Sequence, residues 1–262
     1  AAKEMPELIY LDNKFEKTKD KNKVRYIKYV LKIKRGILYQ NHPAFYKNGS
    51  NYRYHNLKKT ELVGIDTIKD FKNESTRELT SDDYIYQIKR LADYKNHSPI
   101  AGVMQEYIFG FSEYNKKISN AKYKNNSERI ELIKSNQIKG VEKIDNFTFS
   151  IILKKQYPQF VYWLAMPFFS PMPWEADMFY SQPGLQEKNI TLNWFPVGTG
   201  PFKLTENNPN LRMVLEKNKN FRKEVYPSLK DKIVKRKMIS YNKNKVIPFI
   251  DKAIYSLEKE QI

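Results

Sequence analysis

The sequence predicts an α+β fold, in which helices pack with mixed sheets, and three observations lead to this prediction. Some segments alternate apolar and polar residues, as half-buried strands do, and others repeat apolar residues at helical spacing. The two kinds of segment follow each other without a regular strand–helix–strand order, which is typical of α+β proteins. Aromatic residues make up 14% of the 262 residues, and this richness favours sheets over a helical bundle.

The first predicted element is a strand at residues 26–34. Its alternation puts apolar side chains on one face and mostly lysines on the other. The apolar face consists of Ile27, Tyr29, Leu31 and Ile33, and the other face of Lys28, Val30, Lys32 and Lys34. Arg35 and Gly36 end the strand, and the polar, tyrosine-rich residues 39–73 are expected to form a loop.

A helix is predicted at residues 80–92. Thr80 and Asp83 form a capping-box pattern at its start, and apolar side chains then recur at helical spacing as far as Leu91. The neighbouring pair Asp82 and Asp83 lies in the first turn, where the helix dipole favours acidic residues, so it needs no catalytic explanation. Residues 112–136 are polar and compatible with helix, and we expect a surface insertion there.

The second half of the chain predicts two hairpins. The first, at residues 138–154, has alternating strands on either side of a turn at Asp145 and Asn146. The second, at residues 200–217, turns at residues 207–210. The remaining predicted elements are a short helix after Pro158, a helix at residues 174–180, a basic linker at residues 228–246 and a strand at residues 249–257.

The sequence shows no group of residues suited to catalysis or to metal binding. The absence of cysteine excludes disulfides, thiolate metal sites and a cysteine nucleophile. The three histidines are not spaced as metal ligands are; they are His42, His55 and His97. Residues 198–200 lack the lysine of a phosphate loop, and Pro201 removes a backbone N–H that such a loop would use. We therefore expect a protein that is not an enzyme and that has no catalytic residue, metal or cofactor.

The net charge of +18 leaves a second function class open. Such a charge attracts nucleic acids and anionic membranes, so a basic nucleic-acid-binding protein is an alternative. Most of the cations are lysines spread along the chain, and the densest run, at residues 230–237, is short. This distribution favours a solvated basic surface over a nucleic-acid-binding face.

The chain contains no segment typical of a signal peptide or a transmembrane helix. Its first residues include no apolar stretch. The most apolar run, residues 160–169, is too short to cross a bilayer and is interrupted by Pro167. If the protein is exported, we expect its signal to lie upstream of Ala1 or to have been removed.

Four segments resemble, in the same order, the family 5 extracellular solute-binding proteins, which include the oligopeptide- and dipeptide-binding proteins. The segments lie at residues 29–39, 79–91, 141–149 and 196–204. The last of them, PVGTGPFKL, is the most specific, because RMVLEKN and NFR follow it as they do in the family. Residues 42–45 and 173–177 further resemble a longer branch of the family.

The resemblance implies a periplasmic-binding-protein-like fold of type II, a clamshell of two lobes. Residues 1–190 would form a lobe-one subdomain, residues 191–262 would return to the main sheet of that lobe, and the second lobe would be absent from this chain. The implied function is the periplasmic or otherwise extracytoplasmic solute-binding subunit of an ABC importer. It captures a peptide or similar small solute, delivers it to the membrane permease and needs no nucleic acid. A truncated, non-functional fragment of such a protein is a further alternative.

The resemblance also gives candidate site residues. Aromatic side chains suit peptide capture because they combine a large contact area with a polar group. The candidates are Tyr162, Trp163, Trp174 and Trp194, and packing within the lobe is the competing explanation for each. The family motif is expected to be structural, shaping the chain where it re-enters the sheet; it consists of Pro196, Val197, Gly198, Thr199, Gly200 and Pro201.

Overall fold

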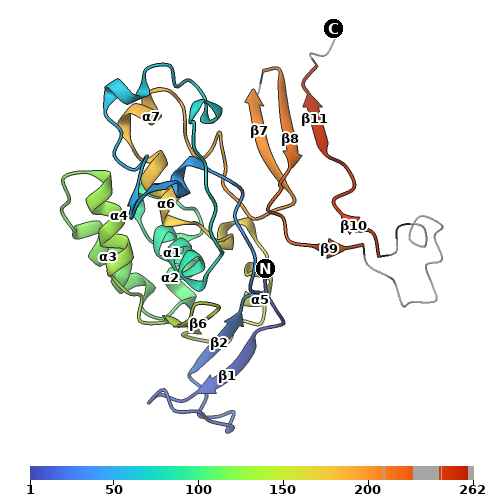
Figure 1. The fold of residues 1–262 in the computed structure, drawn as a ribbon. Coiled ribbons are helices and arrows are strands. Elements are labelled where there is room, and N and C mark those ends of the chain that lie inside the picture. The colour runs from blue at the N-terminus through green and yellow to red at the C-terminus, as the bar shows by residue number, and fades with distance from the viewer. Residues whose placement is uncertain (209, 227–241, 243, 259–262) are drawn as a thin grey trace.

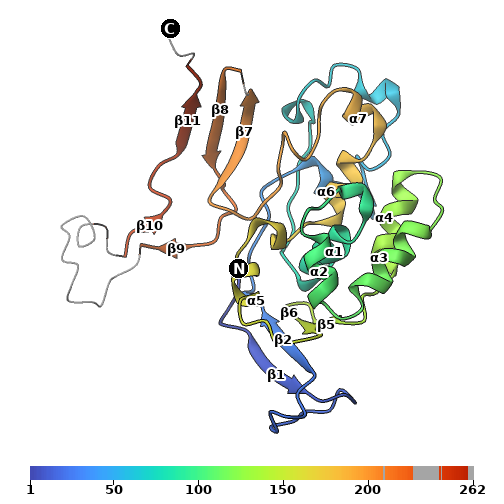
Figure 2. The same cartoon turned by 180° about the vertical axis from the view of Figure 1, so that it is seen from behind.

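The computed structural model describes residues 1–208, 210–226, 242 and 244–258. It has the predicted mixture of helices and sheets. Helices and a four-stranded sheet form a compact body, and a separate three-stranded sheet, together with a small two-stranded hairpin, projects from one side of it (Figures 1 and 2). The predicted linker at residues 228–246 and Pro209 of the second predicted turn lie largely or wholly outside the described residues.

The body contains an antiparallel sheet with the strand order β1–β2–β6–β5. The strands are β1 (Glu7–Leu11), β2 (Tyr26–Lys32), β5 (Val141–Asp145) and β6 (Thr148–Leu153). The predicted strand at 26–34 and the predicted hairpin at 138–154 are both present. β1 has no counterpart among the predicted elements, because four of its five residues are exposed or half-exposed and give no clear alternation.

The predicted division of β2 into an apolar and a polar face is only partly correct. Ile27 and Tyr29 are buried, as expected. Val30, assigned to the polar face, is buried as well, and its cross-strand partner Ser150 is fully buried. The centre of the sheet is therefore covered on both faces.

The helix α1 (Ser81–Leu91) begins as predicted: the Thr80 N–H donates to the Asp83 side chain at 2.9 Å, and the Asp83 N–H donates to the Thr80 carbonyl at 3.2 Å. It packs against β5, β6 and α4. The expected surface insertion at residues 112–136 is wrong. That segment forms most of α3 (Phe111–Asn120) and all of α4 (Asn126–Ser135), whose few apolar side chains enter the core. The buried ones are Phe111, Tyr114, Ile118, Ile130 and Ile133.

Four short helices complete the body. They are α2 (Ala101–Tyr107), α5 (Phe160–Trp163), α6 (Trp174–Tyr180) and α7 (Pro183–Glu187). The helices predicted after Pro158 and at residues 174–180 are thus present, whereas α2 and α7 were not predicted. The expected loop at residues 39–73 contains the short strands β3 (Lys47–Asn48) and β4 (Asn51–Tyr52), and it contributes buried aromatic residues to the core.

We call the projecting three-stranded sheet the blade; it has the strand order β11–β8–β7. Its strands are β7 (Phe202–Asn208), β8 (Arg212–Lys217) and β11 (Lys252–Ser256). The second predicted hairpin is therefore present, and the last predicted strand is shorter than the expected 249–257. A small hairpin of β9 (Glu224–Val225) and β10 (Val246–Ile247) lies beside the base of the blade (Figure 1).

Candidate functional site

The family motif lies at the junction between the body and the blade, where the chain passes from α7 towards β7. The Gln40 backbone N–H donates to the Gly198 carbonyl at 2.9 Å. The Gln40 side chain donates to the Pro196 carbonyl at 3.2 Å and accepts from the Gly198 N–H at 3.3 Å. These three hydrogen bonds tie the motif to the body, and its structural role stays a prediction.

Two asparagines extend the junction on the blade side. The Asn218 side chain donates to the Gly200 carbonyl at 2.9 Å, and its backbone N–H donates to the Pro201 carbonyl at 2.8 Å. The Asn220 side chain reaches the body, where it donates to the Tyr39 carbonyl at 2.9 Å. Both asparagines belong to the RMVLEKN and NFR segments that follow the motif, so these segments supply hydrogen bonds on the blade side of the junction.

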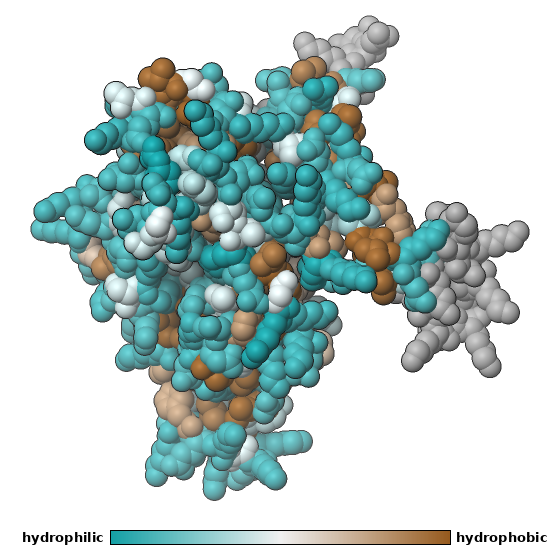
Figure 3. All heavy atoms as spheres, in the orientation of Figure 1, coloured by the Kyte–Doolittle hydropathy of each residue, from teal (hydrophilic) through white to brown (hydrophobic). Residues whose placement is uncertain are grey.

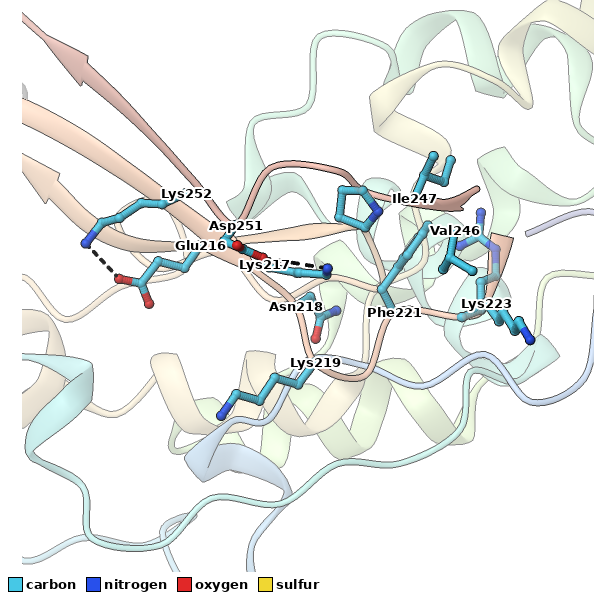
Figure 4. A pocket seen from close by; sticks show the side chains of 12 residues that line it. Glu216, Lys217, Asn218, Lys219, Phe221, Lys223, Val246, Ile247, Asp251 and Lys252 are labelled. Carbon is cyan, nitrogen blue, oxygen red and sulfur yellow. Dashed lines mark ion pairs between the residues drawn. The ribbon is translucent and has the colours of Figure 1, made fainter. Parts of the chain in front are cut away.

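A pocket of about 650 Å³ lies next to this junction, between the base of the blade and the β9–β10 hairpin (Figure 4). Its lining combines apolar side chains with many charges. The apolar residues are Phe221, Val246, Ile247 and Pro248, and the charged residues are Lys217, Lys219, Arg222, Lys223, Lys252, Glu216 and Asp251. Cations thus outnumber acids in the lining, and the pocket attracts anionic groups.

Most of these charges already have partners. Lys252 pairs with Glu216 at 3.3 Å, and Lys217 lies 3.7 Å from Asp251. Arg222 pairs with Glu224 at 2.6 Å. Within the part of the chain that the structure describes, Lys219 and Lys223 form no ion pair, so they are the cations of this pocket that remain available to a solute.

A second polar arrangement surrounds Arg77, whose guanidinium forms forked ion pairs with two carboxylates. Its contacts to Asp83 measure 2.6 and 2.9 Å, and its contacts to Glu175 measure 2.6 and 2.7 Å. Both carboxylates are almost completely buried. Burial raises the pKa of Asp83, although the hydrogen bonds from Arg77 oppose this shift. A cavity of about 330 Å³ opens beside Arg77 and is lined by Phe45, Tyr46, Lys47, Tyr52, Ser75 and Thr76.

The four predicted aromatic residues do not form one cluster. Trp163 is buried among Tyr107, Tyr157 and Phe160, whereas its neighbour Tyr162 is 71% exposed. The two residues are neighbours in α5, but the Trp163 side chain lies in the core and the Tyr162 side chain faces solvent.

The other two tryptophans lie in separate places. Trp174 starts α6, contacts the rings of Tyr52 and His55, and has the Lys134 ammonium 3.6 Å from its ring centroid. Trp194 lies just before the junction, where its carbonyl accepts from the Asn207 side chain at 3.1 Å. Among the described residues, no ring contact joins Trp163, Trp174 and Trp194 to one another. Their role in ligand binding stays a prediction.

Neither Arg77 nor the pocket beside the β9–β10 hairpin is among the residues that the sequence predicts for a site. Arg77 occurs in a segment without periodicity, and its partner Glu175 is 98 residues away along the chain. The pocket joins β8 to residues around Pro248, which only the tertiary structure brings together. Residues 217–223, with the sequence KNKNFRK, carry a cluster of cations that was the one local signal for this site.

Two further features bear on the class of protein. No group of three or more His, Asp or Glu side chains suited to a metal ion occurs in the described part of the chain. The helices described there are also all too short or too polar to cross a membrane.

Comparison with known proteins identifies a family match. Residues 69–244 match the model for bacterial extracellular solute-binding proteins, family 5 Middle. The periplasmic oligopeptide-binding protein OppA of Salmonella typhimurium is 30% identical over 143 residues, which cover 55% of this chain and 23% of OppA. The chain therefore spans about a quarter of the length of the curated relative that it matches.

Solved structures give similar matches at lower identity. Listeria monocytogenes OppA bound to peptide has 13% identity and a TM-score of 0.47, over 84% of this chain and 30% of that one. Burkholderia pseudomallei OppA has 17% identity and a TM-score of 0.46, over 83% of this chain and 33% of that one.

Proposed function

The chain belongs to the bacterial extracellular solute-binding proteins of family 5, and we propose that it forms most of one lobe of a solute-binding subunit. In this proposal the protein acts outside the cytoplasm, captures a peptide or a similar small solute, and delivers it to the permease of an ABC importer without chemical change. The observation that carries the proposal is the family match over residues 69–244. The oligopeptide-binding relative supports the choice of a peptide as solute.

The division of the chain supports the proposed lobe. The body ends near the junction at residues 196–201, close to the predicted boundary between residues 190 and 191. In this proposal the blade, which is a sheet separate from that of the body, corresponds to the main sheet to which residues 191–262 are expected to return. The alternative of a nucleic-acid-binding protein rests on positive charge, and the family match favours solute binding over it.

We further propose that the pocket beside the β9–β10 hairpin contributes to solute binding. Lys219 and Lys223 attract a carboxylate, such as the C-terminus or an acidic side chain of a peptide. Phe221 offers an apolar surface next to them. Of the predicted aromatic residues, Tyr162, Trp174 and Trp194 expose part of their surface and remain candidates for solute contact, while Trp163 would have to leave the core first.

Saturation-transfer NMR of the 262-residue chain with a library of short peptides tests the proposal, since it detects weak complexes. We expect saturation transfer to some peptides and a clear reduction in the Lys219→Glu/Lys223→Glu variant. The matched control is Lys14→Glu/Lys19→Glu, which makes the same charge change on the exposed β1–β2 connection. If no peptide receives saturation, the peptide assignment fails. If transfer occurs but neither variant changes it, peptide binding stands and the site assignment fails.

A further inference from the structure

A polar pocket of about 420 Å³ lies within the body, between the end of α1, the start of α4, the end of α6 and the segment after α7. In both ribbon views α4 lies on the side of the body opposite the blade, so this pocket is separate from the one beside the β9–β10 hairpin (Figures 1 and 2). That side of the body is mostly hydrophilic on the face that Figure 3 shows. Apart from Leu192, every residue in the lining has a charged, amide or hydroxyl side chain. Such a lining suits a hydrophilic ligand, because an apolar one would leave these groups without hydrogen-bond partners.

The charges around this pocket leave a positive surplus. Its charged lining residues are Arg90, Lys95, Arg129 and Asp177. The Arg90 Nε donates to Asp177 at 3.2 Å, and Arg129 lies 3.8 Å from the other oxygen of Asp177. Arg129 also pairs with Asp93, which lies outside the lining. The two arginines and the two aspartates balance one another, so Lys95 leaves a net charge of +1.

All three cations keep donors that these ion pairs do not use. Arg90 bonds to Asp177 through Nε alone, so its two terminal nitrogens have no hydrogen-bond partner among the described residues. The Nε of Arg129 is buried and likewise lacks a partner in the described part of the chain, and the whole residue is only 6% exposed. Lys95 contacts the Tyr123 ring, 4.6 Å from its centroid, and forms no ion pair with a described residue. Unmatched donors of this kind are costly unless an acceptor from outside the chain, such as a water or an anion, satisfies them.

We propose that this pocket binds a small hydrophilic compound through a single carboxylate or phosphate group. The anionic group lies between Arg90, Lys95 and Arg129, where it neutralises the surplus charge and accepts from the unused donors. The flat guanidinium of Arg90 presents two terminal nitrogens, which match two oxygens of a carboxylate or a phosphate. Amide and hydroxyl side chains elsewhere in the lining, such as Thr191 and Asn193, bond to the uncharged part of the compound.

Isothermal titration of the 262-residue chain with gluconate, glucose 6-phosphate and glucose tests the site. The first two compounds carry the two kinds of anionic group on similar hydroxylated frames, and glucose carries neither. We expect at least one of the anions to bind about tenfold or more tightly than glucose, and the tighter anion identifies the group that the pocket prefers. The Nε–H signal of Arg129 in NMR spectra should shift during the same titration, because the bound anion changes its surroundings.

Two variants test the residues. Lys95→Glu changes the surplus from +1 to −1 without removing a buried ion pair, so it should weaken anion binding about tenfold or more. Arg90→Lys keeps a cation beside Asp177 but loses the two terminal guanidinium nitrogens, and it should weaken binding to a similar extent. If Arg90→Lys does not fold, the exposed Lys95 still tests the site, because its side chain is not part of the core.

Two controls separate this site from other basic regions of the chain. Lys14→Glu makes the same charge change on the exposed β1–β2 connection, and Lys219→Glu/Lys223→Glu changes the pocket beside the β9–β10 hairpin. Neither should alter anion binding, and the result does not depend on whether the protein binds peptides. The proposal is overturned if neither anion binds, if glucose binds as tightly, or if either control weakens binding as much as Lys95→Glu. Binding that leaves the Arg129 signal unchanged also overturns it, because the anion then lies elsewhere.

Discussion

At the scale of single residues, one arginine neutralises part of a buried acidic pair. Arg77 is the cation that forms ion pairs with Asp83 and Glu175, and both carboxylates are almost fully buried. The three side chains carry a net charge of −1. Loss of the arginine would leave two buried negative charges without a cation, whereas loss of one acid would leave a balanced pair. Removing one partner of a buried ion pair is costly because the other charge is left uncompensated.

We therefore predict that Arg77→Met lowers the free energy of unfolding by about 3–5 kcal/mol at neutral pH. Glu175→Gln should cost much less, because it removes one of two acids and leaves Arg77 paired with Asp83. Denaturant unfolding of both variants beside the unmodified chain measures the difference. Equal losses in the two variants would show that packing, and not charge, determines the effect.

His42 gives the second residue-scale prediction. It is fully buried, its Nδ1 accepts from Ala44 N–H at 3.1 Å, and its Nε2 donates to the Tyr180 hydroxyl at 2.7 Å. Tyr180 in turn donates to the Phe195 carbonyl at 2.6 Å. Burial, with a further contribution from Lys203, lowers the pKa of His42 to about 3. The neutral ring therefore satisfies both of its nitrogen atoms inside the body.

The direction of the pH dependence follows from this pKa. An unfolded histidine has a pKa of about 6.5, so between about pH 6.5 and 3 the unfolded state binds the extra proton. The free energy of unfolding should fall by about 1.4 kcal/mol per pH unit below about pH 6. His42→Asn should remove that slope, while His55, whose pKa burial also lowers, contributes in the same direction in both proteins. The free energies of unfolding of both proteins, measured at several pH values, check the predicted loss of slope. An unchanged slope in His42→Asn would contradict the prediction.

At the scale of elements, glycines mark where two segments approach closely. Gly140 precedes β5, and a Cβ built on it would clash with the Phe109 carbonyl oxygen. That carbonyl also accepts the Gly140 N–H at 2.9 Å, so the backbone cannot move aside freely. Gly102 is in the helix α2, and a Cβ there would meet nothing within 4 Å.

We predict opposite effects of alanine at these two positions. Gly140→Ala should destabilise the protein by about 1–3 kcal/mol, because the clash forces a backbone shift. Gly102→Ala should stabilise it by about 0.5–1 kcal/mol, since alanine favours helix over glycine. Thermal unfolding of the two variants compares them directly. Destabilisation by Gly102→Ala would contradict the prediction, and it would mean that position 102 does not have the open, helical environment described for it.

The elements that could be predicted from the sequence are those whose start, turn or alternation lies within a few consecutive residues. α1 was predicted because Thr80 and Asp83 mark its start within four residues, and both hairpins were predicted because each alternates around its own turn. α3 and α4 were interpreted as a surface insertion because their polar residues outnumber the few, such as Ile118 and Ile133, that reach the core. The Arg77 cluster and the pocket at the base of the blade had no such local signal, since their members meet only through the tertiary fold.

At the scale of the whole molecule, the blade is attached to the body by a narrow set of contacts. The main apolar core is built from body residues, and the buried Val214 of β8 is not part of it. Hydrogen bonds from Gln40, Asn218 and Asn220 at the junction provide much of the connection. Regions with few apolar contacts open more easily than the core, so the blade should open as a separate unit.

Native-state hydrogen exchange should therefore show two levels of protection, with the amides of β2, β6 and α1 exchanging more slowly than those of β7 and β8. Asn220→Ala removes the side-chain bonds to the Tyr39 carbonyl and to the Asn41 side chain, at 2.9 and 2.6 Å. At about 1 kcal/mol for each bond, exchange in the blade should accelerate about tenfold or more, while the body remains unchanged.

The matched control is Asn210→Ala, an exposed turn position in the blade. It should leave both levels of protection as they are. Equal acceleration of body and blade by Asn220→Ala would instead mean that the chain unfolds as one cooperative unit. In that case the junction would be part of the global core, and the body and the blade would not be separable parts of the proposed lobe.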